Sequence, residues 1–261
     1  MIIHNVEQNS PEWLQLRKTK IGASDASAIM QVSPWSTPFR LWFEKTYDVQ
    51  RKENPSMSFG KANEESARIL YQQMTGNFVA PLVASHGKRE WQLASFDGMD
   101  IDFSMFVEIK CANKDDHATA KSGTVPSKYY PQVQHQLAVA ELDAMHYFSF
   151  HKGEGIVVEV HRDDAYIKKL IKAEEKFYFD HLVAKKAPKM TDKDGIEMDD
   201  EVWNQISFVY QESLKELDQI KLKVNELERQ LLTLADNKNC HGNGVFVARF
   251  SEDDPWKIDV A

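Results

Sequence analysis

Hydrophobic and polar positions alternate most clearly between Trp91 and Ala112. A short apolar run leads into Asp97-Gly98, a dipeptide typical of tight turns, and the odd-numbered residues from Phe103 to Ile109 are then all apolar. This period of two predicts a strand whose odd-numbered side chains face the core. Glu108 and Lys110 then share the opposite face, because residues two apart on a strand point the same way. We therefore expect a hairpin that brings Asp97 close to this pair.

Helical periodicity flanks this hairpin on both sides. The segment from Gly60 to Met74 predicts an amphipathic helix with a face of Ala62, Ser66, Ile69, Leu70 and Met74. The segment from Tyr129 to Leu142 predicts a second helix, with Gln132 and Gln136 on a face of their own. The other expected elements are a strand over residues 78–84, a loop over 113–127, a hairpin of strands 145–151 and 156–161, and a helix from Asp163 to about Lys185.

A different period begins in the last quarter of the chain. From Trp203 to Leu234 apolar residues recur at alternating three- and four-residue steps, with Ser213 filling one position. This is the period of a coiled-coil seam. A helix from about Asp199 to Asp236 would be roughly 55 Å long, too long for a compact core. Its seam could pack within its own domain, against a neighbouring subunit or against a partner.

Residues 245–250 and 256–260 predict a terminal hairpin after this helix. The change of composition follows Ala187-Pro188-Lys189. We therefore expect a core over residues 1–190 and a helical appendage over residues 191–261, and we interpret the appendage as an interaction or assembly element.

Composition places the chain among ordinary globular proteins. It has 261 residues, of which 42% are hydrophobic and 28% are charged. Cys111 and Cys240 have no metal-binding spacing and indicate a reducing compartment. No signal peptide opens the sequence and no apolar run approaches the ~20 residues of a membrane span, so we expect a cytoplasmic protein with no membrane partner. The net charge of -8 argues against broad coating of nucleic acid, but it is compatible with a confined basic cleft.

The expected cluster of Asp97, Glu108 and Lys110 suits hydrolysis of a phosphodiester. Two carboxylates hold hard cations such as Mg²⁺ through oxygen. The cation activates water and neutralises charge on the phosphate, and a neighbouring lysine positions the water or stabilises developing charge. A surface hairpin with an ordinary ion pair between Glu108 and Lys110 is the alternative interpretation.

Two further stretches carry candidate binding residues. Arg17 follows Trp13 by one helical turn, and Ser24 opens a helix whose free amides could receive a phosphate. The structural alternative is a capping serine beside a surface arginine. Trp35 belongs to an expected aromatic cluster with Phe39, Trp42 and Phe43. Such clusters are usually core, although Trp35 could instead act as a wedge between terminal base pairs.

These pieces together resemble a known family, the PD-(D/E)XK nucleases of the phage lambda exonuclease branch, or YqaJ-type viral recombinases. The P in the name PD-(D/E)XK stands for a proline before the aspartate, and Phe96 occupies that position in this sequence. The motifs that carry the resemblance are Trp13-x-x-x-Arg17, Ile21-Gly22-Ala23-Ser24, Gly60-x-x-x-Glu64-x-x-Ala67-Arg68, Ser95-Phe96-Asp97-Gly98, Val107-Glu108-Ile109-Lys110-Cys111 and Tyr129-x-x-Gln132-Val133-Gln134.

The resemblance implies a fold and a site. The fold would be α/β, a restriction-endonuclease-like core with a mixed central sheet flanked by helices, to which the helical C-terminal appendage is added. Asp97, Glu108 and the carbonyl of Ile109 would bind Mg²⁺, for which Mn²⁺ could substitute, with Glu64 completing the metal site or its surroundings. Lys110 would position the nucleophile with support from Gln132. Arg17 and Ser24 would hold the terminal 5′ phosphate.

The resemblance also implies an activity and partners. It predicts 5′→3′ digestion of double-stranded DNA from its ends, leaving 3′ overhangs for a single-strand annealing protein during phage recombination. It further predicts a ring-shaped homo-oligomer, encoded by a phage or prophage, in a bacterial host cell. Two alternatives stay open at this point: an endonuclease of restriction or repair type, and a non-catalytic DNA-binding or partner-recruiting module.

Overall fold

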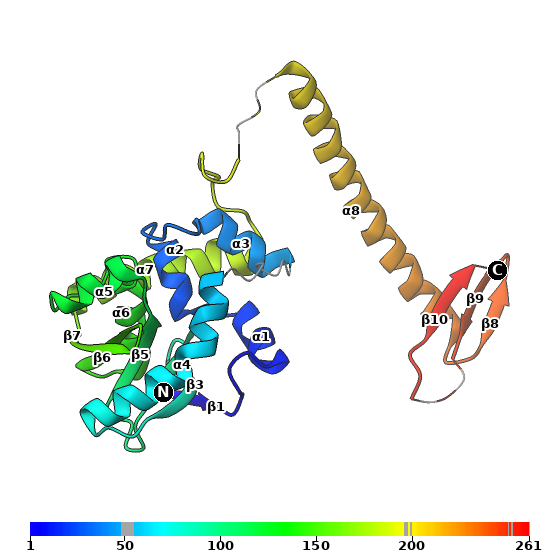
Figure 1. Ribbon diagram of the computed structural model, residues 1–261. Helices are drawn as coiled ribbons and strands as arrows, with labels where there is room; N and C mark the ends of the chain where they lie inside the picture. The colour runs from blue at the N-terminus through cyan, green and yellow to red at the C-terminus, as the bar shows by residue number, and fades with distance from the viewer. Residues whose placement is uncertain (48–54, 196–197, 199, 250, 252, 261) are drawn as a thin grey trace. The chain divides into compact units, whose positions relative to one another are not determined.

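The computed structural model describes residues 1–47, 55–195, 198, 200–249, 251 and 253–260. It divides into two compact units, Met1–Gly195 and Ile196–Ala261. The first unit holds the central sheet and its helices, and the second holds one long helix and a small sheet (Figure 1).

A mixed sheet forms the centre of the first unit. Its strand order is β1-β3-β4-β5-β6-β7, and β2 pairs with β4. The β2–β4 and β5–β6 pairs are parallel and the others are antiparallel. The strands are β1 Ile2–His4, β2 Ile21–Gly22, β3 Ala80–Ser85, β4 Gln92–Met99, β5 Phe106–Cys111, β6 Ala144–His151 and β7 Glu154–His161. The hairpin of β6 and β7 confirms the one predicted there.

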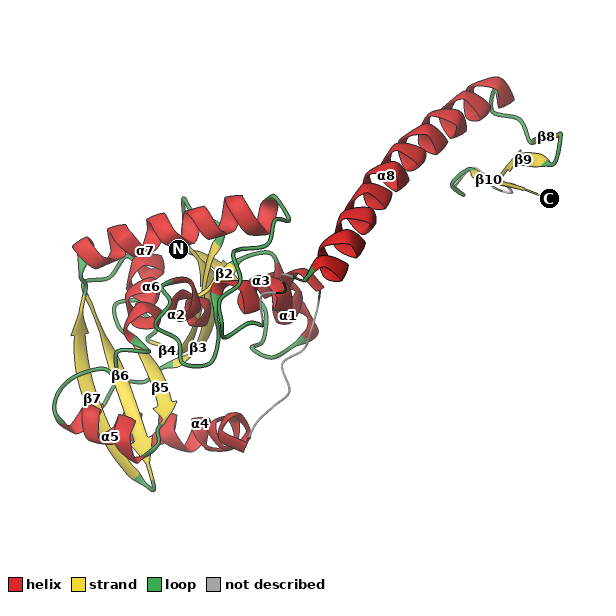
Figure 2. Ribbon diagram, turned by 90° about the horizontal axis from the view of Figure 1, so that it is seen from above, coloured by secondary structure: helices red, strands yellow, loops and turns green. Residues whose placement is uncertain are grey.

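Helices cover both faces of this sheet (Figure 2). The helices of the first unit are α1 Pro11–Lys18, α2 Ala26–Ile29, α3 Pro38–Tyr47, α4 Pro55–Thr75, α5 Lys114–Lys121, α6 Tyr130–Ala140 and α7 Asp164–Phe177, with the short turns η1 Ala23–Asp25 and η2 Tyr178–Val183. Ser10 caps α1 by accepting a hydrogen bond from the Trp13 amide, and Asp163 caps α7 through the Tyr166 amide, as their positions in the sequence indicate.

Strand β5 is buried on both faces, which differs from the predicted alternation. Phe106 packs in the core cluster of α6, which includes Val133 and Leu137. Val107 and Ile109 pack in a second cluster with Ala67 and Tyr71 of α4. Because two helical layers enclose the strand, its even-numbered residues Phe106 and Glu108 are buried as well.

The buried face of α4 is not the predicted one. Ile69 and Met74 are exposed, whereas Ala67 and Tyr71 are fully buried. The prediction followed helical spacing alone, but the helix lies close to β5 and turns the small Ala67 toward it. This orientation sets Glu64, one turn before Ala67, on the side of the helix near the sheet.

The prediction of a loop over residues 113–127 is wrong, because this segment contains α5. Asn113 caps this helix by accepting hydrogen bonds from the amides of Asp115 and Asp116. Ala120 and His117 are buried. A polar segment with a strong cap and a few buried positions thus forms a helix.

The second unit begins its regular structure at α8, Glu201–Ala235, which Asp200 caps through the Trp203 amide. Strands β9 Val245–Ala248 and β10 Lys257–Val260 form the predicted terminal hairpin, and β8 Cys240–Gly242 adds a third strand. Asp199 and Phe250, at the edges of the predicted elements, lie outside the described residues. None of the helices in the described parts of the chain is both apolar and long enough to span a bilayer.

Candidate functional site

The Asp97-Gly98 pair lies inside β4 and not in a turn, which corrects the prediction. The turn is farther on, where the Asp100 carboxylate accepts hydrogen bonds from the amide of Ser104 at 2.8 Å and from its hydroxyl at 2.6 Å. A Cβ atom on Gly98 would lie 2.4 Å from Val79 Cγ2 and 2.9 Å from Val107 Cγ1. The glycine is therefore required by close packing within the sheet.

Position 96, where the motif name has proline, is also part of this strand. Phe96 pairs with Leu82 of β3 and is fully buried against the Phe106 ring, with ring centroids 4.8 Å apart. Proline cannot donate to a sheet ladder, whereas phenylalanine suits a buried strand. The departure from the motif name is thus explained by the packing of β4.

Asp97 joins β4 to β5 where the backbone pairing stops. The paired residues are Met99 with Phe106 and Gly98 with Val107. One step further, Asp97 Oδ2 accepts a hydrogen bond from the Ile109 amide at 2.7 Å. The side chain therefore replaces a backbone acceptor and is held in a fixed orientation beside Glu108.

The Glu108 carboxylate is buried, although a solvent-facing strand end was expected; its residue is only 2% exposed. Its Oε1 accepts hydrogen bonds from Lys110 Nζ and Gln132 Nε2, each at 2.5 Å. Its Oε2 accepts one from Gln136 Nε2, also at 2.5 Å. Burial of a charge is tolerated only with such partners. The three donors thus fix both oxygens of Glu108.

Both glutamines come from α6, which is buried over most of its length. Gln136 was not among the predicted site residues, although its spacing of four from Gln132 placed the two on one helix face. A glutamine on a helix face is usually solvated, and only the burial of α6 against the sheet shows otherwise. Gln136 Nε2 also lies 3.2 Å from the Ser95 carbonyl oxygen on β4.

Glu64 reaches the edge of this cluster through Arg68. Arg68 Nη2 donates to Glu64 Oε1 at 2.8 Å, and Arg68 Nε donates to the Asp97 carbonyl at 2.8 Å. Arg68 was part of the sequence motif but had no predicted role. It ties α4 to the strand that carries Asp97 and so holds Glu64 near the carboxylates of Asp97 and Glu108.

The charges of the cluster alter one another's protonation. The pKa of Asp97 is raised well above its usual range by burial and by the nearby charges of Glu108 and Glu64, against the effect of Lys110. Burial by itself would lower the pKa of Lys110, but the Glu108 and Asp97 carboxylates outweigh it and raise that pKa. The negative charge of these carboxylates therefore exceeds the positive charge that Lys110 supplies.

This donor set fits a Mg²⁺ ion. Among the described residues, no three side chains of His, Cys, Asp or Glu gather closely enough to enclose a metal. Magnesium usually binds through one or two carboxylates, water and substrate phosphates, so a complete protein cage is not required. In the described hydrogen bonds, Asp97 Oδ1 has no donor and Glu108 Oε2 has one, which leaves acceptor capacity on each carboxylate.

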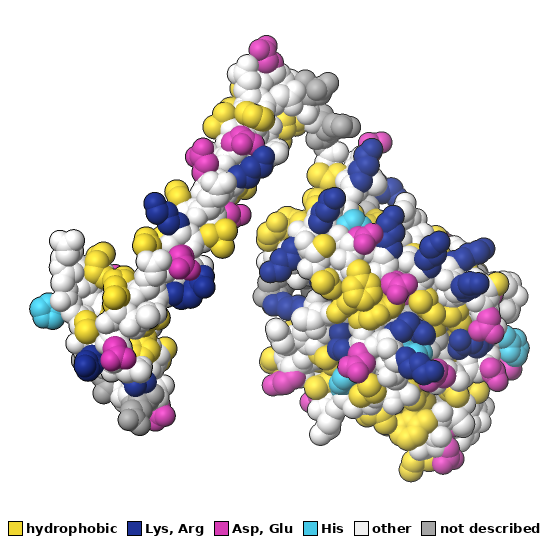
Figure 3. Space-filling model, turned by 180° about the vertical axis from the view of Figure 1, so that it is seen from behind, with side chains coloured by type: hydrophobic (Ala, Val, Ile, Leu, Met, Phe, Trp, Pro, Cys, Tyr) yellow, Lys and Arg dark blue, Asp and Glu magenta, His cyan; other side chains and the backbone are white. Residues whose placement is uncertain are grey.

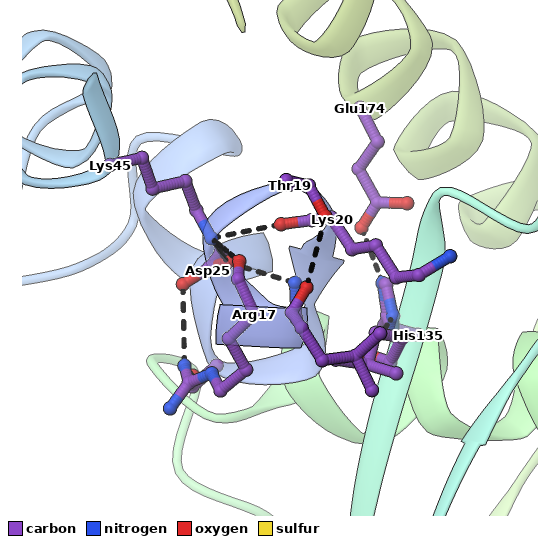
Figure 4. Close-up of polar contacts among 11 residues, drawn as sticks. Arg17, Thr19, Lys20, Asp25, Lys45, His135 and Glu174 are labelled. Atoms are coloured by element: carbon purple, nitrogen blue, oxygen red, sulfur yellow. Dashed lines mark hydrogen bonds and ion pairs between the residues drawn. The ribbon is translucent and has the colours of Figure 1, made fainter. Parts of the chain in front are cut away.

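A second polar cluster contains the predicted phosphate residues (Figure 4). Arg17 Nη2 donates to Ser24 Oγ at 2.8 Å and lies 3.7 Å from Asp25 Oδ1. Lys45 Nζ lies 2.8 Å from Asp25 Oδ2 and donates to the carbonyls of Arg17 and Lys20 at 2.9 Å. Sequence reasoning missed Asp25 and Lys45. Asp25 adjoins the small-residue motif, but no local pattern marks Lys45, which arrives from α3.

The two clusters are connected through β4. Trp13 Nε1 donates to Ser95 Oγ at 2.9 Å, and the Arg17 guanidinium carbon lies 4.6 Å from the centre of the Trp13 ring. Ser95 also meets Gln136 through its carbonyl oxygen. A short path of contacts thus links Arg17 to the residues around Glu108.

Trp35 lies beside the site and not in the predicted aromatic cluster. Its ring centre is 6.0 Å from that of Tyr129, and Lys110 Nζ lies 5.2 Å from the Tyr129 ring centre. Lys128 Nζ is 5.0 Å from the Trp35 ring. Phe39 instead contacts Trp42 and Phe43. Because Trp35 is about half exposed, it offers an aromatic face beside Tyr129, whose ring lies near Lys110.

A buried ion pair behind the two clusters was not predicted. His135 Nδ1 lies 2.6 Å from Glu174 Oε1, and its Nε2 lies 3.1 Å from the Leu93 carbonyl oxygen. Gln92 Nε2 donates to Glu174 Oε2 at 2.6 Å. Burial would lower the pKa of His135, but Glu174 raises it overall. An acceptor at each ring nitrogen favours the protonated form of His135, which joins α6 to α7.

Comparisons with known proteins agree with this architecture. The Bacillus subtilis (strain 168) protein YqaJ is 30% identical over 197 residues, which cover 73% of this chain and 62% of that protein. The chain thus spans less than two thirds of the length of this relative. The crystal structure of an alkaline exonuclease from Laribacter hongkongensis has a TM-score of 0.59 and 25% identity, over 67% of this chain and 94% of that one. The same exonuclease in complex with dAMP has a TM-score of 0.58 at the same identity and coverage.

The model of the YqaJ-like viral recombinase domain matches residues 12–143. This range begins just before Trp13 and ends after α6, so it contains Arg17, Asp97, Glu108 and Gln136. The mixed sheet flanked by helices is the fold shared with the exonuclease structures. The chain belongs to the YqaJ-like viral recombinase family.

Proposed function

We propose that this chain is a metal-dependent exonuclease that digests double-stranded DNA from its 5′ ends and leaves 3′ overhangs. The observation that carries the proposal is the Glu108 carboxylate, buried beside Asp97 and held by Lys110, Gln132 and Gln136. Membership in the family and the likeness to an alkaline exonuclease support it.

Asp97, Glu108 and the Ile109 carbonyl would hold Mg²⁺, or Mn²⁺ in its place. The bound cation supplies Lewis-acid activation of water and neutralises charge on the scissile phosphate. Glu64 lies outside this pair and adds negative charge near Asp97. Its role in our proposal is to support the site through Arg68.

The protein groups have separate tasks in this scheme. Lys110 keeps its ammonium proton because Glu108 and Asp97 raise its pKa, so it acts as a fixed hydrogen-bond donor to the attacking water or the phosphate. Gln132 and Gln136 orient Glu108. Asp97 is oriented by the Ile109 amide.

Arg17 and Ser24 would receive the terminal 5′ phosphate. The Arg17 side chain is about a third exposed and presents its guanidinium beside the Ser24 hydroxyl. Trp35 and Tyr129 would stack on bases near the cut, which corresponds to the proposed wedge. A terminal phosphate bound at Arg17 would direct the enzyme to DNA ends.

The family also suggests the setting of this activity. We propose a phage- or prophage-encoded enzyme in the cytoplasm of a bacterial host, a ring-shaped homo-oligomer around DNA, and an annealing protein that receives the 3′ strand. These assignments rest on the family alone.

End dependence tests the proposal directly. Purified protein is incubated with Mg²⁺ and a linear duplex labelled at one 5′ or one 3′ end, and in parallel with a covalently closed circle. We expect rapid release of label from the 5′ end, slow loss of the 3′ label and an intact circle. Opening of the circle would show the endonuclease alternative, and no cleavage of any substrate would show a binding module.

A further inference from the structure

The long helix of the second unit exposes a continuous apolar seam. Apolar and charged side chains alternate along the surface of α8 (Figure 3). Ile206 and Ile220 are 65% and 58% exposed, values unusual for large aliphatic side chains at regular spacing. The seam consists of Trp203, Ile206, Tyr210, Ser213, Leu217, Ile220, Val224, Leu227, Leu231 and Leu234.

Within the second unit, Leu231 is the seam residue that is partly covered, whereas Leu234 remains exposed. Helix α8 packs on β9, where Ala235 and Val247 are buried, and Leu231 is half-buried. From Trp203 to Leu227 all the seam residues, Ser213 included, are exposed. The alternating steps of three and four assign Trp203 to an a position and Ile206 to a d position of a heptad repeat.

The residues flanking this seam indicate what covers it. The four charged residues at e and g positions are Glu216, Lys221, Lys223 and Glu228. In a parallel, in-register pair of identical helices, a g residue faces the e residue five positions later on the other helix. This geometry sets Glu216 opposite Lys221 of a second copy, and Lys223 opposite Glu228. Every charged flanking position then meets its opposite.

One pair of uncharged flanking positions also matches. Val209 at a g position would face Leu214 at an e position of the second copy, so that an apolar pair extends the seam. An antiparallel pair with the same seam overlap would place Glu216 opposite Lys223 but would leave Lys221 opposite Leu214. The parallel arrangement therefore gives more of the flanking residues a complementary neighbour.

These charges are available for pairing between helices. Among the described residues, Glu216, Lys223 and Glu228 make no ion pair within the chain, and Lys221 has only an exposed contact of 3.5 Å with Asp218. Lys215, at an outward f position, has a similar contact with Glu212 at 2.6 Å. A solvated helix of this kind is marginal alone and is stabilised when its apolar seam is buried.

We propose that α8 pairs with α8 of a second copy of this chain as a parallel, in-register two-stranded coiled coil. This contact is separate from the catalytic unit and does not depend on the proposed nuclease activity. It joins catalytic units in pairs through their C-terminal helices.

A charge exchange in the full-length chain tests both the partner and the direction. Lys221→Glu would face Glu216 of the other copy and should weaken pairing by roughly tenfold or more, since two attractive contacts become repulsive. Glu216→Lys combined with Lys221→Glu should restore it. Lys215→Glu is the matched control, because it removes the same charge and a similar intrahelical contact outside the seam.

The readout is the mass of the particle by light scattering across a dilution series. Near the dissociation range, the wild type and the control should contain twice as many chains as the Lys221→Glu variant. Equal masses for Lys221→Glu and the wild type throughout the series would overturn the proposal. Failure of the double variant to restore the wild-type mass would exclude the parallel register.

A covalent measurement gives a second, independent test. Ser213 occupies a d position, where parallel in-register helices bring identical residues together. In a Cys240→Ser background, Ser213→Cys should form a disulfide-linked dimer under mild oxidation, whereas Lys215→Cys should not. The absence of the Ser213→Cys dimer would contradict the proposed register, because an antiparallel pair sets this residue opposite Val224.

Discussion

Apolar side chains are usually buried and polar ones exposed, and the two units of the protein depart from this rule in opposite ways. In the first unit, the polar residues Glu108, Gln132 and Gln136 are buried and meet one another. In the second unit, Ile206, Ile220 and other apolar residues are exposed. Burial of a charge costs free energy unless partners are present, and exposure of a regular apolar seam costs free energy unless a partner covers it.

The two units differ in where their partners come from. The carboxylate of Glu108 receives its donors from the same chain, so the candidate site is complete within one copy apart from its cation and substrate. Within the second unit, the described residues give the seam of α8 no equivalent cover from Trp203 to Leu227. In our proposals, one unit is therefore organised around a ligand, and the other around another protein chain.

The largest effect is expected from the charged residues of the candidate site in the first unit. Asp97→Asn, Glu108→Gln and Lys110→Ala should each reduce cleavage of linear duplex DNA by on the order of a thousandfold or more, because they remove charge at the reacting phosphate. Asp102→Asn, an exposed carboxylate in the same hairpin, is the control. Circular dichroism should show a folded protein in all four variants. Wild-type rates in any of the three site variants would remove that residue from the mechanism.

A smaller effect is expected from the glutamine that sequence reasoning missed. Gln136→Leu frees Glu108 Oε2 and should lower the cleavage rate by about 10–100-fold, as removal of groups that orient metal ligands commonly does. Gln134→Leu is the control, since Gln134 is equally buried on α6 but donates to the His161 carbonyl. Equal losses in the two variants would mean that Gln136 acts only on stability.

The phosphate cluster should change selectivity more than rate. Arg17→Ala should slow digestion of 5′-phosphorylated ends about tenfold, the loss of one charge-assisted hydrogen bond, with little change on 5′-hydroxyl ends. Lys18→Ala on the same helix serves as the control. Lys45→Met should have the same selective effect if Lys45 positions Arg17 through Asp25. An equal loss on both kinds of ends would disprove the anchor.

Removal of the second unit should leave the cleavage activity of the first unit largely unchanged. A chain ending at Gly195 should fold and cleave short duplexes at a rate within a few-fold of the full chain, while its particle mass falls because α8 is gone. Gly195 is a better end than Met190, because Asp194 accepts hydrogen bonds from Thr37 and from the Thr191 amide. An inactive or aggregated product would show that the first unit depends on the second.

The smallest effect concerns the buried pair of His135 and Glu174. Because the folded-state pKa of His135 is raised, its stabilising contribution is complete below the ordinary histidine pKa of about 6.5 and is lost as the pH rises through the raised value. Thermal melting at a series of pH values should show this loss in the wild type. In the double variant His135→Gln, Glu174→Gln, that part of the pH dependence should be absent. Parallel profiles would contradict a charged His135.

Sequence patterns predicted elements better than they predicted burial. The hairpin of β6 and β7, the cap of α7 and the terminal hairpin follow from local residues, and the structure confirms them. The predicted buried face of α4 was wrong, and so was the loop predicted where α5 forms, because the depth of packing depends on which elements meet. No periodicity shows that the small Ala67 lies closest to the sheet.

The candidate site shows the same limit. Asp97 and the Glu108–Lys110 pair were predicted to converge, and the structure places them together, but by a different route: Asp97 lies within β4, and the turn comes later. Gln136 and Lys45 come from α6 and α3, far along the chain from the groups they hold. Their contacts depend on tertiary packing, which a local motif does not describe.

Binding of Mn²⁺ by the full-length protein tests the central claim most directly. Manganese is paramagnetic, so the free and bound ion can be distinguished by electron paramagnetic resonance without any cleavage assay. The wild type and Asp102→Asn should bind the ion, and Asp97→Asn and Glu108→Gln should each weaken that binding by at least about tenfold. Equal binding by all four proteins, or no binding by the wild type even with a DNA end present, would contradict a cation site at Asp97 and Glu108.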